Sequence, residues 1–352
     1  MDKTTFLESV NLLKSLIEIP SISTEEEAAA NFLQQYLENV GIEVGRKGNN
    51  IWCLSPNFSL DKNTILLNSH IDTVKPTSQW MKSPFKALEV NGKLYGLGSN
   101  DAGASLVSLL RVFLDLCKTT QNYNLVFLAS CEEEISGVGG VADVLNCLPP
   151  ISFALVGEPT EMQPAIAERG LMVLDVIAKG KAGHAAREEG INAIYEAVDD
   201  IIWFRDYRFE KKSPVLGPVK MTMTVIQAGT QHNVIPDRCA MTVDVRSNEL
   251  YSNRELFEEI KIHVKSEVVP HSFRLNSSFI DLNHPFVKRA MKLDLKPFGS
   301  PTLSDQALMP FPSLKMGPGK SSRSHTADEF VMLKEIEKAI PLYYHLLDGL
   351  EL

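Results

Sequence analysis

The chain has 352 residues, of which 44% are hydrophobic and 22% are charged, and its formal net charge at pH 7 is −9. This composition is typical of a globular protein, and the length predicts two domains rather than one. The acidic balance, with no basic stripe, argues against a nucleic-acid partner.

The sequence also argues against a membrane-bound or secreted protein. Residues 1–16 are amphipathic but contain no signal-peptide core, and no apolar run approaches the ~20 residues needed to span a bilayer. Five scattered cysteines, never spaced as CxxC, argue against disulfides and against a thiolate zinc site. We therefore expect a cytoplasmic protein.

Helices and buried strands alternate in the first part of the chain. Apolar residues recur at helical spacing from Phe6 to Ile17 and from Phe32 to Val40, and a third helix is predicted at 105–117. Uninterrupted apolar runs predict strands at 64–68, 124–130, 151–156 and 313–316. This alternation predicts an α/β fold whose sheet is mostly parallel and carries helices on both faces.

The middle of the chain predicts a different unit. Its elements are a strand, a helix, two strands, a helix and a strand, at 171–180, 192–204, 219–229, 238–247, 253–268 and 272–279. This β-α-β-β-α-β order is that of a ferredoxin-like domain. We therefore predict an inserted domain at 169–280 and an α/β domain formed by 1–168 and 281–352. The latter should resume with a helix from Pro285 and end with a long helix from Asp328.

Polar side chains follow the predicted parallel strands, where ligands of open α/β sheets bind. They are His70 and Asp72, the triplet Glu132, Glu133 and Glu134, then Glu158 and His325, with Asp101 before the helix at 105–117. So many acids at one edge would repel one another strongly unless a cation lay among them. Histidine and carboxylate ligands without cysteine suit Zn²⁺, and also Co²⁺ or Mn²⁺.

Six segments of the chain resemble the motifs of the M20 metallopeptidases. They are HIDTV (70–74), YGLGSNDAGAS (95–105), CEEE (131–134), VGEPT (156–160), GKAGHAA (180–186) and HNVIPD (232–237). The resemblance extends from about residue 6 to residue 350. It implies a zinc-peptidase-like domain with an inserted dimerisation domain. That family includes acetylornithine deacetylase, succinyl-diaminopimelate desuccinylase, aminoacylase and carboxypeptidases.

The resemblance implies a dinuclear centre with two Zn²⁺ ions per subunit, for which Co²⁺ could substitute. Asp101 would bridge the ions. The other implied ligands are His70 and Glu158 for one ion, and Glu134 and His325 for the second ion. Asp72 would orient the ring of His70, as carboxylates commonly do for zinc histidines.

The glutamate triplet can be aligned with the family in two registers. In the register that fits the preceding strand, Glu133 is the general base, Glu134 is the ligand, and Glu132 faces solvent or a neighbouring backbone. In the other register, Glu132 is the base and Glu133 is the ligand. We adopt the first register as the prediction.

Further residues are expected to bind substrate. The resemblance implies a homodimer in which His184, on the inserted domain, donates a hydrogen bond to the oxyanion in the partner subunit's active site. Asn233 and Arg246 are expected to bind the substrate carboxylate, because an arginine fork suits bidentate binding. Ser304, Gly317 and Gly319 are expected to line the pocket.

The chain departs from the family beside Asp101. The family usually has a Lys-Gly pair where this chain has Gly103 and Ala104, and the arginine of its YGRG motif is Leu97 here. These positions are not metal ligands, so the departures leave the predicted hydrolysis intact.

These features predict a dinuclear zinc amidohydrolase that acts on a small-molecule N-acyl-L-amino acid. The overall pattern is most similar to acetylornithine deacetylase, which predicts deacetylation of N-acetylornithine in arginine biosynthesis. N-acetylcitrulline, N-succinylornithine and acetyl-lysine are alternative substrates, and a dipeptidase or carboxypeptidase is an alternative activity. A non-catalytic protein that kept the fold is disfavoured because neither a ligand nor the base is missing.

Overall fold

The computed structural model describes residues 3–187 and 189–352, and the chain divides into two compact units. The first unit comprises Met1–Ile166, Ile280–Phe298 and Ser304–Leu352. The second unit comprises Ala167–Phe279 and Gly299–Leu303. No helix among the described residues combines the length and the apolar character needed to cross a membrane.

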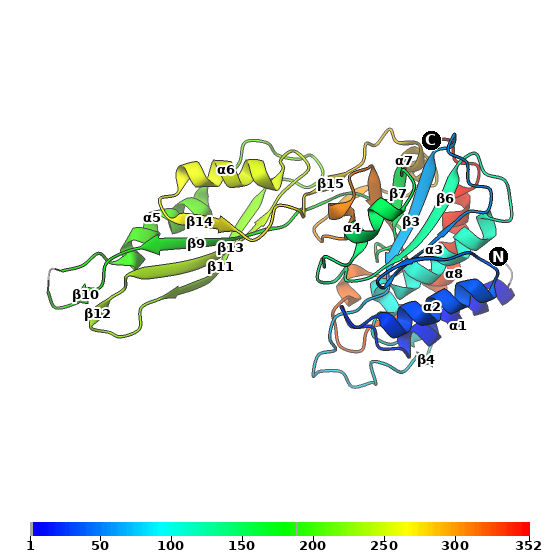
Figure 1. Cartoon of the computed structure of the whole chain (residues 1–352), viewed down its shortest axis with the longest axis horizontal. Coiled ribbons are helices and arrows are strands. Elements are labelled where there is room, and N and C mark those ends of the chain that lie inside the picture. The colour runs from blue at the N-terminus through cyan, green and yellow to red at the C-terminus, as the bar shows by residue number, and fades with distance from the viewer. Residues whose placement is uncertain (1–2, 188) are drawn as a thin grey trace. The chain divides into compact units, whose positions relative to one another are not determined.

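The first unit contains a sheet with the strand order β1-β2-β6-β3-β7-β17-β8. Figure 1 shows its central strands β6, β3 and β7 side by side. The parallel strands are β3 (Thr64–His70), β6 (Asn124–Ser130), β7 (Phe153–Val156) and β17 (Ser313–Lys315). The antiparallel strands toward the edges are β1 (Gly45–Lys47), β2 (Asn50–Leu54) and β8 (Ala165–Glu168). Every residue of β3 and β6 is buried, as expected for strands covered on both faces. The predicted α/β class, with a mostly parallel central sheet, is confirmed.

Alternate residues of the strands pack against helices on opposite faces of this sheet. On one face, Phe127 of β6 contacts Phe113 of helix α3, with ring centroids 6.0 Å apart. On the other face, Val126 and Leu128 join a buried cluster with Val141 and Val144 of helix α4. Helices α1 and α8 pack against α3 in turn. The helices of this unit are α1 (Lys3–Ile17), α2 (Glu27–Asn39), α3 (Ala104–Leu116), α4 (Val141–Val144), α7 (Pro285–Lys292) and α8 (Leu333–Leu347).

Short elements complete the first unit and carry much of the site described below. A three-stranded sheet has the order β18-β5-β4. Its strands are β4 (Leu88–Val90), β5 (Lys93–Tyr95) and β18 (Phe330–Met332). The single-turn helices are η1 (Ser99–Gly103), η2 (Leu145–Cys147), η3 (Asp305–Leu308) and η4 (Ser321–Arg323).

The second unit contains a four-stranded antiparallel sheet with the order β11-β13-β9-β14, which is the ferredoxin-like order. Burial alternates along β9, since one face packs into a core with helices α5 and α6. The elements are β9 (Met172–Lys179), α5 (Ala193–Asp206), β11 (Lys220–Ala228), β13 (Arg238–Arg246), α6 (Asn253–His263) and β14 (Glu267–Pro270). A two-stranded ribbon pairs β10 (Gly183–His184) with β12 (Val234–Ile235), and the remaining short strands are β15 (Ser278–Phe279) and β16 (Phe298–Ser300).

Two predicted boundaries are wrong. The last strand of the ferredoxin-like sheet is β14 at 267–270, which overlaps the end of the segment predicted as helix, and not 272–279. Helix α6 ends at His263 because the β-branched residues that follow pair with β9 instead. The C-terminal helix begins at Leu333 rather than Asp328, because residues 330–332 pair with β5 as a strand.

Candidate metal centre

The carboxyl ends of the parallel strands bring polar side chains together. His70 is the last residue of β3, Glu134 follows β6, and Glu158 follows β7. Asp101 lies in η1, which leads directly into α3, and His325 lies between η4 and β18. Each residue therefore projects from the edge of the sheet at which ligands of α/β proteins bind.

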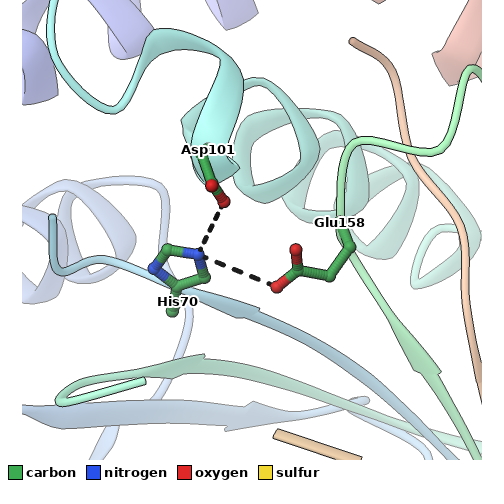
Figure 2. Close-up of side chains that lie close together, drawn as sticks. All are labelled: His70, Asp101 and Glu158. Atoms are coloured by element: carbon green, nitrogen blue, oxygen red, sulfur yellow. Dashed lines mark hydrogen bonds and ion pairs between the residues drawn. The ribbon is translucent and has the colours of Figure 1, made fainter. Parts of the chain in front are cut away.

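The first cluster consists of His70, Asp101 and Glu158 (Figure 2). Nε2 of His70 lies 3.3 Å from Oδ1 of Asp101 and 3.8 Å from Oε1 of Glu158. One ligand atom from each residue lies within 4.8 Å of the other two. The side chain of His70 is only 1% exposed, so this cluster is closed off from bulk solvent on the side of β3.

The second cluster consists of Asp101, Glu134 and His325. Nε2 of His325 lies 2.7 Å from Oε2 of Glu134 and 3.6 Å from Oδ2 of Asp101. The side chain of His325 is 55% exposed, while that of Glu134 is 6% exposed. Asp101 belongs to both clusters and directs a different carboxylate oxygen to each histidine.

Asp72 lies behind the first cluster and links it to the glutamate triplet. The Nδ1 atom of His70 lies 2.9 Å from the backbone oxygen of Asp72 and 3.4 Å from its Oδ1 atom. The backbone N–H of Glu133 donates to Oδ1 of Asp72, at 3.0 Å. The N–H of Glu134 and the hydroxyl of Ser23 donate to Oδ2, at 3.1 and 2.7 Å. One buried aspartate thus orients the ring of His70 and holds the backbone of two glutamates.

The three glutamates of the triplet point in different directions. Glu132 has a left-handed backbone, with φ of 54°, and its Oε2 accepts a hydrogen bond from the N–H of Gly139 at 3.0 Å. Its carboxylate therefore faces a neighbouring backbone rather than the clusters. Glu134 faces His325. The backbone N–H of Glu133 donates to the Oδ1 atom of Asp72 that faces the ring of His70, so Glu133 lies beside the first cluster.

The electrostatics of the clusters test whether a cation fits there. Burial, followed by the charge of Asp101, raises the pKa of Glu158 to about 8. Burial also raises the pKa of Glu133 well above its ordinary value, and the pKa of Glu134 as well. The hydrogen bond with Glu134 raises the pKa of His325 to about 9. These raised pKa values mean that the crowded carboxyl groups would take up protons if no cation were bound. Divalent metal ions would supply the positive charge instead, so the residues present fit such ions.

His184, the expected catalytic donor to the oxyanion, and Asn233, expected to bind the substrate carboxylate, come together in the second unit. His184 ends β10 and Asn233 directly precedes β12, and the N–H of Ala185 donates to the backbone oxygen of Asn233 at 3.0 Å. Nδ1 of His184 accepts a hydrogen bond from the N–H of Ala186 at 3.1 Å. A neutral ring with Nδ1 as acceptor carries its proton on Nε2, so the exposed edge of His184 is a hydrogen-bond donor.

Arg246 lies on β13 of the second unit and already has a carboxylate partner. Its Nε and Nη2 atoms donate to the two carboxylate oxygens of Asp244, at 2.8 and 3.0 Å. This is the bidentate geometry expected for a substrate carboxylate, but the partner is a side chain of the same strand.

The predicted pocket residues mainly support the backbone. Ser304 is buried, and its hydroxyl accepts a hydrogen bond from the N–H of Gln306 at 3.4 Å in η3. The carbonyl of Gly317 accepts from the N–H of Thr160 at 3.1 Å, and that of Gly319 from the next N–H at 2.9 Å. Both glycines therefore hold the segment that follows Glu158.

The backbone explains one departure from the family. A Cβ atom at Gly103 would lie 2.6 Å from the carbonyl oxygen of Gly98 and 2.7 Å from Leu13. The N–H of Gly103 also donates to that same carbonyl at 2.9 Å. A lysine at position 103 does not fit this backbone, so glycine is required there.

Sequence reasoning missed two residues that surround Asp101. The buried carboxylate of Glu329 accepts hydrogen bonds from the backbone N–H groups of Gly98, Asn100 and Asp101. The buried carboxamide of Asn100 bonds with the backbone of Lys320. The only sequence signals were an acid directly before the apolar run at 330–333 and an asparagine directly before Asp101.

Two clusters that share an aspartate, at the carboxyl edge of a parallel sheet, are the arrangement of a metal-dependent hydrolase of the α/β class. Residues 66–349 match the peptidase family M20/M25/M40, and the chain belongs to that family. It is accordingly a metal-dependent enzyme that hydrolyses amide bonds.

Individual relatives are similar over almost the whole chain. An acetylornithine deacetylase from Proteus mirabilis is 26% identical over 378 aligned residues, which cover 98% of this chain and 96% of the relative. The crystal structure of an aminopeptidase from Bacillus cereus superposes with a TM-score of 0.79 at 19% identity, covering 97% of this chain and 98% of that one. A dinuclear metal-binding M20 peptidase from Bacillus subtilis has a TM-score of 0.75 at 19% identity and covers 98% of both chains.

Proposed function

We propose that the protein is a dinuclear zinc amidohydrolase that removes the acyl group from an N-acyl-L-amino acid, with N-acetylornithine as its substrate in arginine biosynthesis. The observation that carries the proposal is that Asp101 joins two histidine–carboxylate clusters beside a third acid, Glu133. The similarity to the acetylornithine deacetylase of Proteus mirabilis supports the choice of substrate.

Five side chains would hold the metal ions. His70 and Glu158 would bind one Zn²⁺, Glu134 and His325 the other, and Asp101 both. When bound, a pair of such ions polarises a carbonyl group and lowers the pKa of a water molecule toward neutrality. Asp72 would keep Nε2 of His70 turned to the first ion, since Nδ1 faces its backbone oxygen at 2.9 Å.

Glu133 is the proposed general base and acid. Its carboxyl group would accept a proton from the attacking water and return it to the nitrogen of the leaving amine. Burial raises its pKa well above the ordinary value, which suits a group that must both accept and release a proton. Glu132 is turned to Gly139 and Glu134 to His325, so Glu133 is the glutamate of the triplet that fits this role.

Residues of the second unit would bind the substrate. His184, with its proton on Nε2, would donate to the oxyanion that develops on the acyl carbonyl. Asn233, which directly precedes β12, would bind the substrate carboxylate. Arg246 would bind the substrate carboxylate by exchanging Asp244 for it.

A homodimer formed through the second unit belongs to the proposal. Helix α5 exposes a stripe of apolar side chains at helical spacing, namely Ile194, Val198 and Ile202. Strand β11 forms an edge of the sheet and exposes Val225 and Ile226. An apolar stripe together with an unpaired strand edge is a surface that another protein chain commonly covers.

Release of acyl groups by the zinc-loaded protein tests the function. N-acetylornithine, N-acetylcitrulline, N-succinylornithine and acetyl-lysine are compared by kcat/KM, with dipeptides in parallel. We expect the highest value for N-acetylornithine. A higher value for another acyl amino acid would change the substrate, whereas cleavage of dipeptides alone would make the protein a peptidase. Metal analysis of active protein purified without added metal tests the identity of the ions.

Mixed dimers test the role of His184. A chain with His184→Ala should be nearly inactive, since an oxyanion donor contributes about 10²–10³ in rate. A chain with Glu133→Gln should also be nearly inactive, because it lacks the proposed general base. A heterodimer has one site with both changes and one site with neither, so it should regain up to about half of the wild-type turnover. If a mass tag shows that subunits exchange and the mixture stays inactive, His184 does not act in the partner's site.

A further inference from the structure

Two of the three side chains of the second cluster, Asp101 and His325, are carried by separate loops. The Asp101 loop comprises residues 98–101 and precedes α3. The His325 loop comprises residues 319–329 and precedes β18. The two loops are far apart in sequence, and His325 itself is exposed and has a left-handed backbone, with φ of 58°. Something other than sheet packing must therefore hold His325 near Asp101.

Glu329 fixes the backbone of the Asp101 loop. Its Oε1 accepts hydrogen bonds from the N–H groups of Asn100 and Asp101, at 2.7 and 3.0 Å, and its Oε2 accepts from the N–H of Gly98 at 3.1 Å. The residue is 2% exposed. A carboxyl group buried this deeply needs such donors, and three hydrogen bonds leave the loop little freedom to move.

Asn100 makes the reciprocal connection to the His325 loop. Its Oδ1 accepts from the N–H of Lys320 at 3.0 Å, and its Nδ2 donates to the carbonyl of Lys320 at 3.1 Å and to Oγ of Ser324 at 3.3 Å. Gly319 leaves space for this carboxamide, because a Cβ atom there would lie 2.4 Å from Oδ1 of Asn100. Lys320 and Ser324 flank η4, directly before His325.

We propose that Asn100 and Glu329 are positioning residues that set the placement of His325 against Asp101 and thereby the affinity of the second cluster for its metal ion. The inference rests on the proposed function, because it assigns the two clusters to metal ions. Asn100 holds only the His325 loop, so its loss should weaken the second ion alone. Glu329 holds Asp101, which both clusters share, so its loss should weaken both ions.

Titration of metal-free protein with Co²⁺, followed by visible absorption, tests the proposal without an activity assay. We expect wild type to bind two equivalents. In Asn100→Ala, the first equivalent should bind as in wild type, and the second about 10–100-fold more weakly, which is the usual cost of losing a group that supports a metal ligand. In Glu329→Ala, both equivalents should weaken. Glu329→Gln keeps one acceptor oxygen and should fall between Glu329→Ala and wild type.

Asn124→Ala is the matched control. Asn124 is also a buried asparagine whose Nδ2 donates to backbone carbonyls, those of Ser59 and Lys62, but it lies at the opposite end of β6 from the clusters. It should leave both Co²⁺ affinities and both absorption bands unchanged. An equal loss in Asn124→Ala would mean that the effect is general destabilisation, and would overturn the proposal.

Other outcomes separate this inference from the proposed function. If wild type binds two ions and hydrolyses an acyl amino acid, but Asn100→Ala binds the second ion as tightly as wild type or loses both ions equally, only the inference is overturned. If wild type binds fewer than two ions, both fail. If Asn100→Ala does not fold, judged by circular dichroism, Glu329→Gln decides, and unaltered binding of both ions by that variant would overturn the inference.

Discussion

The two histidines of the candidate centre reach Asp101 from different kinds of structure. His70 ends a strand that is buried along its whole length between β6 and β7, and its side chain is 1% exposed. His325 lies in a loop, and its side chain is 55% exposed. The first cluster is thus organised by the sheet itself, while the second depends on hydrogen bonds between loops. We therefore call the first cluster the rigid half of the centre. Local opening of the structure around the second cluster should cost less free energy.

Removal of each histidine should give the largest contrast. His70→Ala removes the partner of Asp72, which is buried, and of Asp101 and Glu158, whose side chains are each 12% exposed, which is a severe change for a largely buried charged network. We expect this variant to retain less than one metal ion per chain, whereas His325→Ala should retain one. Metal analysis after gel filtration measures both. The reverse order would show that the buried cluster is not the tighter site.

The glutamate triplet offers the next contrast, between chemistry and binding. Glu133→Gln should lower kcat by about 10²–10⁴, the usual contribution of a general acid–base, with both ions retained. Glu134→Gln should lose the ion of the second cluster, since it removes the charge that faces His325. Glu132→Gln should remain active, because its carboxylate bonds with Gly139. An inactive Glu132→Gln variant with full metal content would shift the register by one residue.

Asp72 connects the cluster built on the sheet to the cluster that depends on loops, and its loss should have an intermediate effect. Asp72→Asn cannot keep all its acceptor bonds, so we expect both ions to bind about 10–100-fold more weakly. Asp200→Asn is the control, since Asp200 is a buried aspartate of the second unit that accepts bonds from the N–H groups of Lys265 and Ser266. Calorimetric titration measures both variants. If Asp200→Asn also bound the metal ions more weakly, the loss in Asp72→Asn could not be attributed to the contacts of Asp72 with His70 and the glutamates.

The sheet and the gathering of polar side chains at its edge could be predicted because both leave local patterns in the sequence. The run at 124–130 is β6, residue for residue, and His70, Glu134 and Glu158 lie at or shortly after the ends of their strands. The structure brings all five predicted ligands into the two clusters. Buried parallel strands need uninterrupted apolar runs, and their carboxyl ends share one edge, so the juxtaposition follows from the pattern.

The connections between loops could not be predicted in this way. Asn100 and Glu329 bond with backbone groups that lie 220 and more residues away in sequence. Every residue type except proline offers the same backbone N–H and C=O groups, so a sequence pattern cannot indicate which of them will be bonded. The end of α6 was predicted wrongly for a related reason, since it also depends on contacts between distant parts of the chain. Residues 267–270 can be helical or extended by local preference, and pairing with β9 decides.

Ser23→Ala should give the smallest effect and the finest test of the comparison. The hydroxyl of Ser23 donates to Oδ2 of Asp72, the oxygen that also accepts from the N–H of Glu134, whereas His70 lies nearer to Oδ1. Loss of this bond should therefore loosen Glu134 rather than His70.

A hydrogen bond to a charged group contributes about 1.5–3 kcal/mol, and Asp72 keeps its other donors, so we expect the second ion in Ser23→Ala to bind about tenfold more weakly or less. The first ion should bind as in wild type. Ser9→Ala is the control, because the hydroxyl of Ser9 likewise makes a partly buried hydrogen bond but donates to a carbonyl within α1. Weaker binding of the first ion in Ser23→Ala would instead mean that Ser23 acts through the ring of His70, and that the rigid half of the centre depends on the loop that carries Ser23.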